Sequence, residues 1–243
     1  MNTSYLSLLI QRQAQKYGER VALKYRDYAT STWIPVSWNQ FSEKVSKVSR
    51  ALVALGVQAQ ENIGVFSQNK PECLYTDFGA FGVRAVTVPL YATSSEAQVH
   101  YILQDAAIRF LFVGEQYQYD VASRVQNLCH TLKRIIVFDS SVKLAPGDTN
   151  SLYYEDFLAL GDNMELQQQV DKLTAESSPQ DLANILYTSG TTGESKGVML
   201  HHSCYEAAFK AHHGRLTTLG EQDVVMNFLP FTHIFERAWS YYC

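Results

Sequence analysis

Short apolar runs alternate with amphipathic helical stripes along the first two thirds of the chain. Apolar residues three or four positions apart, such as Leu74, Phe78 and Phe81, predict helices between the runs. Strands that alternate with helices across short connections are typical of a mainly parallel sheet flanked by helices. We therefore predict an α/β fold. Four runs have the length and composition of buried strands: residues 63–66, 85–90, 110–113 and 135–138.

Several helix starts are marked by residues that suit a first helical turn. Ser37 with Gln40, and Ser95 with Gln98, have the spacing of a capping box. Pro71 suits the first position of another helix, because the N–H that proline lacks would have no helical partner there. These signals predict helices that begin after residues 37, 70 and 95.

The remaining segments carry weaker patterns. Residues 140–150 are expected to form a loop, and the polar residues 162–181 either a surface excursion or a short helix. Five further elements are predicted: a helix capped by Ser4 and ended by Gly18, a hairpin over residues 21–36, a helix over 117–128, a helix from Ser203 to about residue 213, and a buried strand over 224–229.

A loop rich in hydroxyl groups and glycine, residues 188–197, lies between two apolar runs that are predicted as strands. Glycine lets a backbone turn its N–H groups toward a ligand, and hydroxyl and ammonium groups add further donors. Such a loop can bind a phosphate chain. The alternative is a surface loop without a ligand. The Walker A motif is excluded, because Ser195 stands where that motif requires glycine and no Ser or Thr follows Lys196.

The string from Tyr187 to Gly197 resembles the phosphate-binding signature of the adenylate-forming superfamily, which includes acyl-CoA synthetases, luciferases and peptide-synthetase adenylation domains. It matches every fixed position except Ser195, where proline is usual. Serine does not fix the backbone φ angle as proline does, so the loop is less constrained. Three other stretches resemble fatty acyl-CoA synthetases: residues 69–72, 88–91 and 227–237.

The resemblance implies the fold of the N-terminal part of an adenylate-forming enzyme. Residues 1–243 would form a partial N-terminal domain. The rest of that domain and a small C-terminal domain would lie beyond residue 243. The aromatic-rich end, residues 235–243, also suggests a longer protein, because natural termini are more often polar.

The implied reaction is ATP-dependent activation of a carboxylic acid. A carboxylate attacks the α-phosphate of ATP to give acyl-AMP, and coenzyme A then displaces AMP. The His-Ile-Phe-Glu-Arg string at residues 233–237 favours a long-chain fatty acid as the substrate. The family's adenine-, ribose- and metal-binding motifs would lie outside residues 1–243, so we expect this chain alone to be inactive.

The resemblance also assigns roles to individual residues. Lys196 and His233 are the candidate catalytic residues, with His233 where the acyl carboxylate meets the α-phosphate. Thr188 would also contact Mg²⁺. A structural role for His233 is the alternative. Seven residues would hold the β- and γ-phosphates of ATP: Thr188, Ser189, Gly190, Thr191, Thr192, Gly193 and Lys196.

Composition excludes other classes of function. A net charge of −4 without a basic stripe argues against nucleic-acid binding. The four cysteines have neither metal nor redox spacing, which favours a reduced, cytoplasmic protein. Peripheral contact with a membrane and a homodimer both stay open. No run of residues approaches the roughly 20 apolar residues of a membrane span.

Two further groups of side chains and two alternative functions have weaker support in the sequence. The pairs His201-His202 and His212-His213 lack further ligands, so solvated side chains are expected rather than a metal site. Glu236 and Arg237 are expected to be structural, as a local ion pair. A non-catalytic binding or scaffold module has only Ser195 in its favour. A P-loop NTPase conflicts with the loop spacing.

Overall fold

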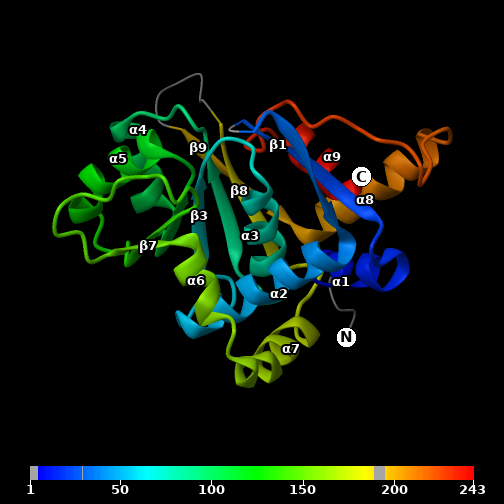
Figure 1. The fold of residues 1–243 in the computed structure, drawn as a ribbon, viewed down its shortest axis with the longest axis horizontal. Helices are drawn as coiled ribbons and strands as arrows, with labels where there is room; N and C mark the ends of the chain where they lie inside the picture. The colour runs from blue at the N-terminus through cyan, green and yellow to red at the C-terminus, as the bar shows by residue number, and fades with distance from the viewer. Residues whose placement is uncertain (1–4, 29, 189–194) are drawn as a thin grey trace.

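The structure is a computed structural model that describes residues 5–28, 30–188 and 195–243. Figure 1 shows a central sheet with helices on both faces. The helices and strands are α1 (Tyr5–Tyr17), β1 (Val21–Asp27), β2 (Thr32–Ser37), α2 (Trp38–Ala54), β3 (Asn62–Phe66), α3 (Pro71–Gly82), β4 (Val86–Leu90), α4 (Glu96–Asp105), β5 (Phe110–Val113), α5 (Gln116–Val125), β6 (Arg134–Val137), β7 (Ser151–Tyr153), α6 (Tyr154–Leu160), α7 (Gln167–Ala175), β8 (Leu182–Thr188), β9 (Lys196–His201), α8 (His202–Arg215) and α9 (Ile234–Tyr242).

The central sheet has the strand order β7-β6-β5-β3-β4-β8-β9. Every neighbouring pair in it is parallel except β8 and β9, which form an antiparallel hairpin. The predicted mainly parallel α/β fold is therefore confirmed. Because the strands β3 to β8 run the same way, their C-terminal ends lie along one side of the sheet, which we call the carboxyl edge. The separate hairpin β1–β2 was also predicted.

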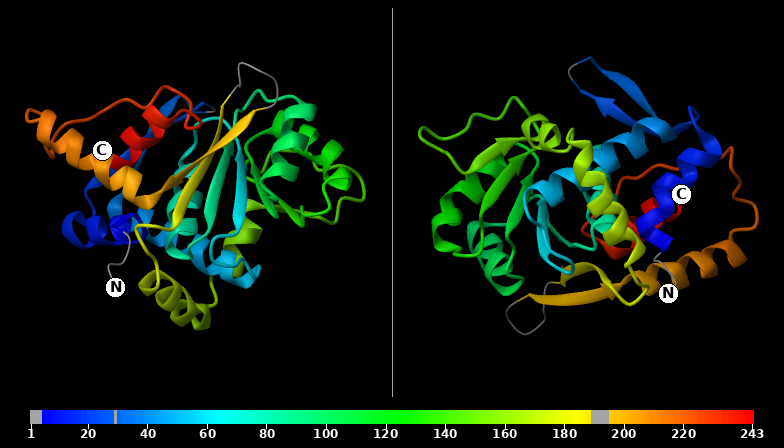
Figure 2. Two further views of the ribbon diagram at one scale, coloured as in Figure 1. Left: turned by 180° about the vertical axis from the view of Figure 1, so that it is seen from behind. Right: turned by 90° about the horizontal axis from the view of Figure 1, so that it is seen from below.

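The core forms two layers, one on each face of the sheet. Residues of β5 alternate between them: Phe110 and Phe112 belong to one cluster, and Leu111 and Val113 to the other. The first cluster includes α1, α2, α3 and α6, and the second α4 and α5. Figure 2 shows these layers from behind and from below. This alternation is what the short apolar runs predict for strands buried on both faces.

Helix α3 has almost no exposed face. Every residue from Cys73 to Gly82 is buried, which exceeds the stripe of Leu74, Phe78 and Phe81 that the spacing predicts. Gly79 allows α2 to pack closely, since a Cβ atom there would clash with the side chain of Val48. The helix is buried because the sheet, α1, α2 and α9 surround it.

The predicted helix starts are confirmed. In the first capping box, Ser37 Oγ accepts the backbone N–H of Gln40 at 3.2 Å, and the Gln40 side chain accepts the N–H of Ser37 at 2.9 Å. The same box forms between Ser95 and Gln98. Pro71 occupies the first turn of α3. Ser4 lies outside the described residues, although α1 begins at residue 5.

The weaker sequence patterns are confirmed in part, and several boundaries differ from the prediction. As predicted, the segment 162–181 contains a short helix, α7, and 140–150 contains neither helix nor strand. Helix α8 is capped at His201 rather than Ser203. The helix predicted over 117–128 ends at Val125 and continues as a 3₁₀ turn. Strand β7 and helix α6 were not predicted, because three and seven residues are too few for a clear period.

The buried strand predicted over residues 224–229 is wrong. Val224, Met226 and Phe228 are 91%, 72% and 74% exposed, and the segment has no regular structure. Their apolar alternation satisfies the pattern of a strand, but no strand of the described sheet pairs with this segment. A strand needs such a partner for its backbone groups.

Among the described residues, no helix combines the length and apolar character needed to span a bilayer.

Candidate functional site

The hairpin β8–β9 brings Thr188 and Lys196 together. The two residues face each other across the antiparallel ladder, at the end of β8 and the start of β9. Side chains on directly opposite residues have Cβ atoms about 5 Å apart and lie on the same face. Both residues are exposed. A hydroxyl and an ammonium group thus flank the base of the candidate phosphate loop.

The rest of the candidate loop falls between these two residues. Ser189, Gly190, Thr191, Thr192 and Gly193 lie outside the described residues. Thr188 ends β8 at the carboxyl edge, where β3 and β4 also end. In open α/β sheets, ligands bind outside this edge. The position of the hairpin therefore suits the binding of an anionic ligand.

Two residues of α4 hold the hairpin at this position. The hydroxyl of Tyr187 donates to Asp105 at 2.5 Å, and the hydroxyl of Tyr101 donates to the carbonyl of Ser195 at 3.0 Å. The two tyrosine rings meet edge to face. Burial and the Asp105 carboxylate raise the pKa of Tyr187, so its hydroxyl keeps its proton and remains a donor. The first residue of the signature is therefore a structural anchor.

Sequence reasoning missed Tyr101 and Asp105. Their only local signal is a spacing of four residues, which puts both on one face of α4. Gly197 of β9 lies opposite Tyr187 of β8 and lets the two strands pack closely. A Cβ atom at residue 197 would lie only 2.8 Å from Cγ2 of Ile185 and 3.2 Å from the Tyr187 ring. The glycine of the signature is thus explained by close packing of β9 on β8.

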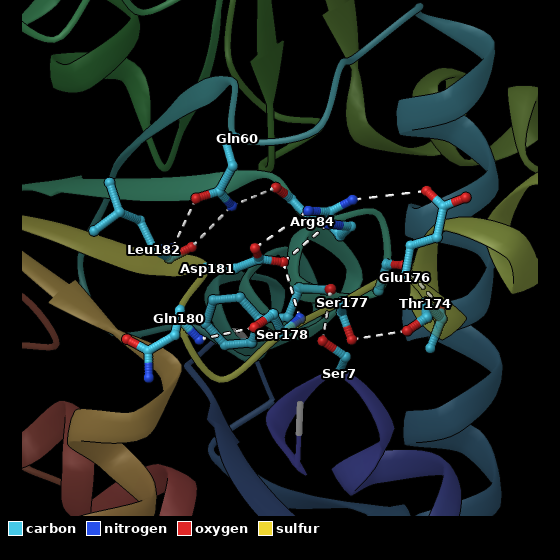
Figure 3. Close-up of polar contacts among 12 residues, drawn as sticks. Ser7, Gln60, Arg84, Thr174, Glu176, Ser177, Ser178, Gln180, Asp181 and Leu182 are labelled. Atoms are coloured by element: carbon cyan, nitrogen blue, oxygen red, sulfur yellow. Dashed lines mark hydrogen bonds and ion pairs between the residues drawn. The ribbon is translucent and has the colours of Figure 1, made fainter. Parts of the chain in front are cut away.

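The other end of β8 is held by a separate polar network. Arg84 donates to both carboxylate oxygens of Asp181, at 2.9 and 3.2 Å. The side-chain amide of Gln60 accepts the N–H of Leu182 at 2.7 Å and donates to the carbonyl of Arg84 at 3.0 Å. Figure 3 shows these residues around the segment that leads into the strand. These contacts lie at the start of β8, at the opposite end of the strand from Thr188 and outside the candidate site.

His233 also reaches the carboxyl edge. It is the N-cap residue of α9, is exposed, and its Nδ1 accepts the N–H of Phe235 at 3.3 Å. The backbone just before it is bonded to Asn69, which follows β3. His233 therefore lies on the same side of the sheet as Thr188 and Lys196. Its ring has a structural contact as a cap, and its other nitrogen has no hydrogen bond within the described part of the chain.

The local ion pair expected between Glu236 and Arg237 is wrong. Arg237 instead donates to Asp77 of α3 at 2.5 Å and to the Tyr241 hydroxyl at 2.7 Å. All of these side chains are buried. Successive residues of a helix point in different directions, so Glu236 and Arg237 cannot face each other. Within the described residues, Oε1 of Glu236 has no hydrogen-bond partner, and burial raises the pKa of its carboxyl group.

The two histidine pairs lie at the start and in the last turn of α8. The described residues contain no group of three or more His, Cys, Asp or Glu side chains that could hold a metal ion. His213 is exposed, but His202 is fully buried, so the expectation of a solvated side chain is wrong there. Burial against Phe81 lowers the pKa of His202 to about 4. All four cysteines are free.

A comparison with protein families identifies the chain. The model of the family described as "AMP-binding enzyme" matches residues 10–243. This chain belongs to the AMP-binding enzyme family. The predicted resemblance to acyl-CoA synthetases is confirmed, and the sequence signature at residues 187–197 is the stretch that predicted it.

Curated relatives of this family member are acyl-CoA ligases. A long-chain-fatty-acid–CoA ligase of Xenopus laevis is 29% identical over 229 residues, which cover 93% of this chain and 30% of the relative. A fatty acyl-CoA synthetase of Dictyostelium discoideum is 32% identical over 209 residues, covering 84% and 30%. The chain thus spans about a third of the length of the relatives it matches.

Solved structures confirm the fold of this member of the AMP-binding enzyme family. A long-chain-fatty-acid–CoA ligase from Archaeoglobus fulgidus superposes with a TM-score of 0.71 at 23% identity, covering 99% of this chain and 45% of that one. An anthranilate–CoA ligase in complex with anthranoyl-AMP gives a TM-score of 0.72 at 22% identity, covering 86% and 37%. The predicted fold of an adenylate-forming enzyme is therefore correct.

Proposed function

We propose that this chain supplies the phosphate-binding part of a ligase that activates a long-chain fatty acid, first to acyl-AMP and then to acyl-CoA. One observation carries the proposal: Thr188 and Lys196 face each other at the base of the signature loop, at the carboxyl edge that His233 also reaches. The curated relatives, which are named as long-chain-fatty-acid–CoA ligases, support the choice of substrate.

The task of these residues is to orient a triphosphate and to offset charge that moves during the reaction. A fatty-acid carboxylate oxygen forms a bond to the α-phosphorus of ATP, and the bond from that phosphorus to pyrophosphate breaks. Pyrophosphate leaves with added negative charge. The Lys196 ammonium and the Thr188 hydroxyl would donate to its oxygens, each contact contributing about 1.5–3 kcal/mol. The thiolate of coenzyme A then attacks the acyl carbon and AMP leaves.

The residues present fit a magnesium ion that is held mainly by substrate. Mg²⁺ typically keeps several waters and takes one or two protein oxygens together with phosphates. The described residues hold no acidic cluster, and Thr188 offers one exposed hydroxyl beside Lys196. Among the described residues, Thr188 would therefore be the ligand that this chain contributes, and the ion would supply further neutralisation of phosphate charge.

The proposal extends to the setting of the protein. Four free cysteines support a reduced, cytoplasmic location. The net charge of −4 supports a protein without a nucleic-acid partner. Fatty acid, ATP and coenzyme A are the proposed substrates, and a homodimer or peripheral membrane contact would be compatible with them.

The test is ATP–pyrophosphate exchange and acyl-CoA formation by the intact protein that carries this chain, with a panel of short-, medium- and long-chain acids. Lys196→Ala should lower the exchange rate roughly tenfold to a hundredfold, the loss expected for one contact to a charged group. Lys172→Ala is the matched control, because Lys172 is exposed on α7 and is not part of the site. Its rate should not change.

Other outcomes identify other functions. A scaffold module would show no exchange in the wild type, and its remaining properties would not respond to Lys196→Ala. A P-loop-type NTPase would hydrolyse ATP without any carboxylic acid. A preference for short-chain acids would remove the long-chain assignment. We expect no exchange from residues 1–243 alone, and measurable exchange from them would contradict that expectation.

A further inference from the structure

The backbone before His233 is bonded to a side chain from a distant part of the chain. The Asn69 amide nitrogen donates to the carbonyl of Leu229 at 2.7 Å, and its amide oxygen accepts the N–H of Phe231 at 3.0 Å. The two partners are 160 and 162 residues away in sequence. Both functional groups of one amide are therefore used to hold residues 229–231 beside the end of β3.

Phe231 is held from its other side by α9. Its carbonyl accepts a hydrogen bond from Nε of Arg237 at 2.7 Å, while Asn69 accepts its N–H. The guanidinium of Arg237 is in turn bonded to Asp77 of α3. The N–H of Phe231 is thus bonded to Asn69, and its carbonyl is linked through Arg237 to Asp77 of α3. His233 follows two residues later, with its N–H bonded to the carbonyl of Pro230 at 2.8 Å.

The cap contact of His233 also determines where its ring carries a proton. A backbone N–H can only donate, so the Nδ1 atom that accepts from Phe235 is unprotonated. A neutral imidazole then carries its proton on Nε2. The exposed Nε2–H group is a donor for an anionic oxygen.

We propose that Asn69 is a positioning residue for His233: it fixes the backbone that holds the His233 ring at the carboxyl edge, with Nε2–H as a donor to an oxygen of the reacting carboxylate or phosphate. This inference deepens the proposed function and rests on it. Asn69 touches no reacting atom in this scheme. Its effect passes through Leu229 and Phe231 to the position of the ring.

The chemistry of the contact requires asparagine. An amide offers one donor and one acceptor, which match the carbonyl of Leu229 and the N–H of Phe231. Asn69→Asp keeps the acceptor, but it places a carboxylate oxygen against the Leu229 carbonyl. This variant should therefore impair the site at least as much as Asn69→Ala does.

The chain provides a matched control at the opposite edge of the sheet. The Gln60 side-chain amide makes the same kind of bridge, accepting the N–H of Leu182 and donating to the carbonyl of Arg84. Gln60 precedes β3, whereas Asn69 follows it. Gln60→Ala therefore removes equivalent hydrogen bonds without touching the carboxyl edge (Figure 3).

The test is a double-mutant cycle in the intact protein, with ATP–pyrophosphate exchange as the readout. Asn69→Ala should lower kcat by about tenfold to a hundredfold, since a small misplacement of a reacting group has this effect. The KM for ATP should stay within about twofold, because the phosphate contacts of Lys196 are not changed. In the His233→Ala background, Asn69→Ala should have no further effect on kcat. Gln60→Ala should leave kcat unchanged and shift the urea midpoint about as much as Asn69→Ala does.

Two outcomes would overturn the positioning role. One is an equal loss of kcat from Asn69→Ala with and without His233, which would indicate a general structural effect. The other is a normal kcat for His233→Ala while Lys196→Ala still lowers the exchange rate. That result would remove the role of His233, and with it the positioning role of Asn69, but it would leave the proposed function intact. Failure of the proposed function itself is distinguishable, because then the wild type would show no exchange at all.

Discussion

The buried ion pair between Asp77 and Arg237 gives the sharpest prediction for stability. The side chains are 1% and 2% exposed, and the pair joins α3 to α9. Replacing Asp77 by asparagine conserves shape but leaves the guanidinium buried without a counter-charge. In the wild type, burial lowers the pKa of Arg237, but the Asp77 carboxylate and the hydroxyls of Tyr241 and Tyr205 raise it overall. A guanidinium is not deprotonated in proteins, so Arg237 stays charged in the variant's core.

The expected cost follows from the burial of both charges. Removal of one partner from a buried pair costs about 3–5 kcal/mol, because the remaining charge has lost its solvent and its partner. For a chain of this size, that corresponds to a drop in Tm of roughly 6–20 °C. The pair Arg124–Glu96 is the matched control: its N–O distance is also 2.5 Å, but its side chains are 52% and 51% exposed. Glu96→Gln should cost at most about 1 kcal/mol.

The assay is urea unfolding followed by circular dichroism, for Asp77→Asn, Arg237→Met, Glu96→Gln and the double variant Asp77→Leu with Arg237→Met. The double variant should be more stable than either single variant at its site, because apolar residues of similar volume carry no desolvation penalty. If Asp77→Asn costs no more than Glu96→Gln, burial does not determine the strength of these pairs and the reasoning is refuted.

Three further predictions concern other buried or closely packed residues. The pKa of His202 is about 4 when folded and about 6.5 when unfolded, so the unfolded chain takes up the proton first. Stability should fall by about 2 kcal/mol between pH 7 and pH 5, and His202→Phe should remove that part of the loss in urea titrations at the two pH values. Gly197→Ala should destabilise the folded protein by about 1–3 kcal/mol, because the added Cβ would lie 2.8 Å from Ile185. Thermal unfolding measures this, and an unchanged Tm would contradict the close packing. Tyr101→Phe should lower the free energy of unfolding by about 1 kcal/mol, because the hydrogen bond to the Ser195 carbonyl is lost. It should also weaken ATP binding measured by calorimetry; an unchanged affinity would show that this hydrogen bond does not support the loop.

Local sequence signals predicted most of the elements because their causes are local. Ser37 and Ser95 cap helices through bonds within four residues, and Pro71 fits the first helical turn whatever surrounds it. The signature loop was found in the same way, from adjacent residues in a fixed order. The pairing of Thr188 with Lys196 follows from a hairpin that the two flanking runs already indicate.

Contacts between distant residues could not be predicted. Nothing near Arg237 points to Asp77, which is 160 residues away, and the adjacent Glu236 was the more obvious partner. Nothing near Asn69 indicates that it binds residues 229 and 231. The error at residues 224–229 has the same origin, since an apolar pattern reports that a strand would be suitable but not whether a neighbouring strand exists.

Helix α3 has a consequence for how this protein can vary. Almost every position from Cys73 to Gly82 is packed against a neighbour, so the helix has no side on which sequence drift would be harmless. Tolerated changes should gather in the polar segments around α7 and α8, where side chains contact water. The helix that leads away from Asn69 is therefore where inherited variants of this protein would be purged most strictly.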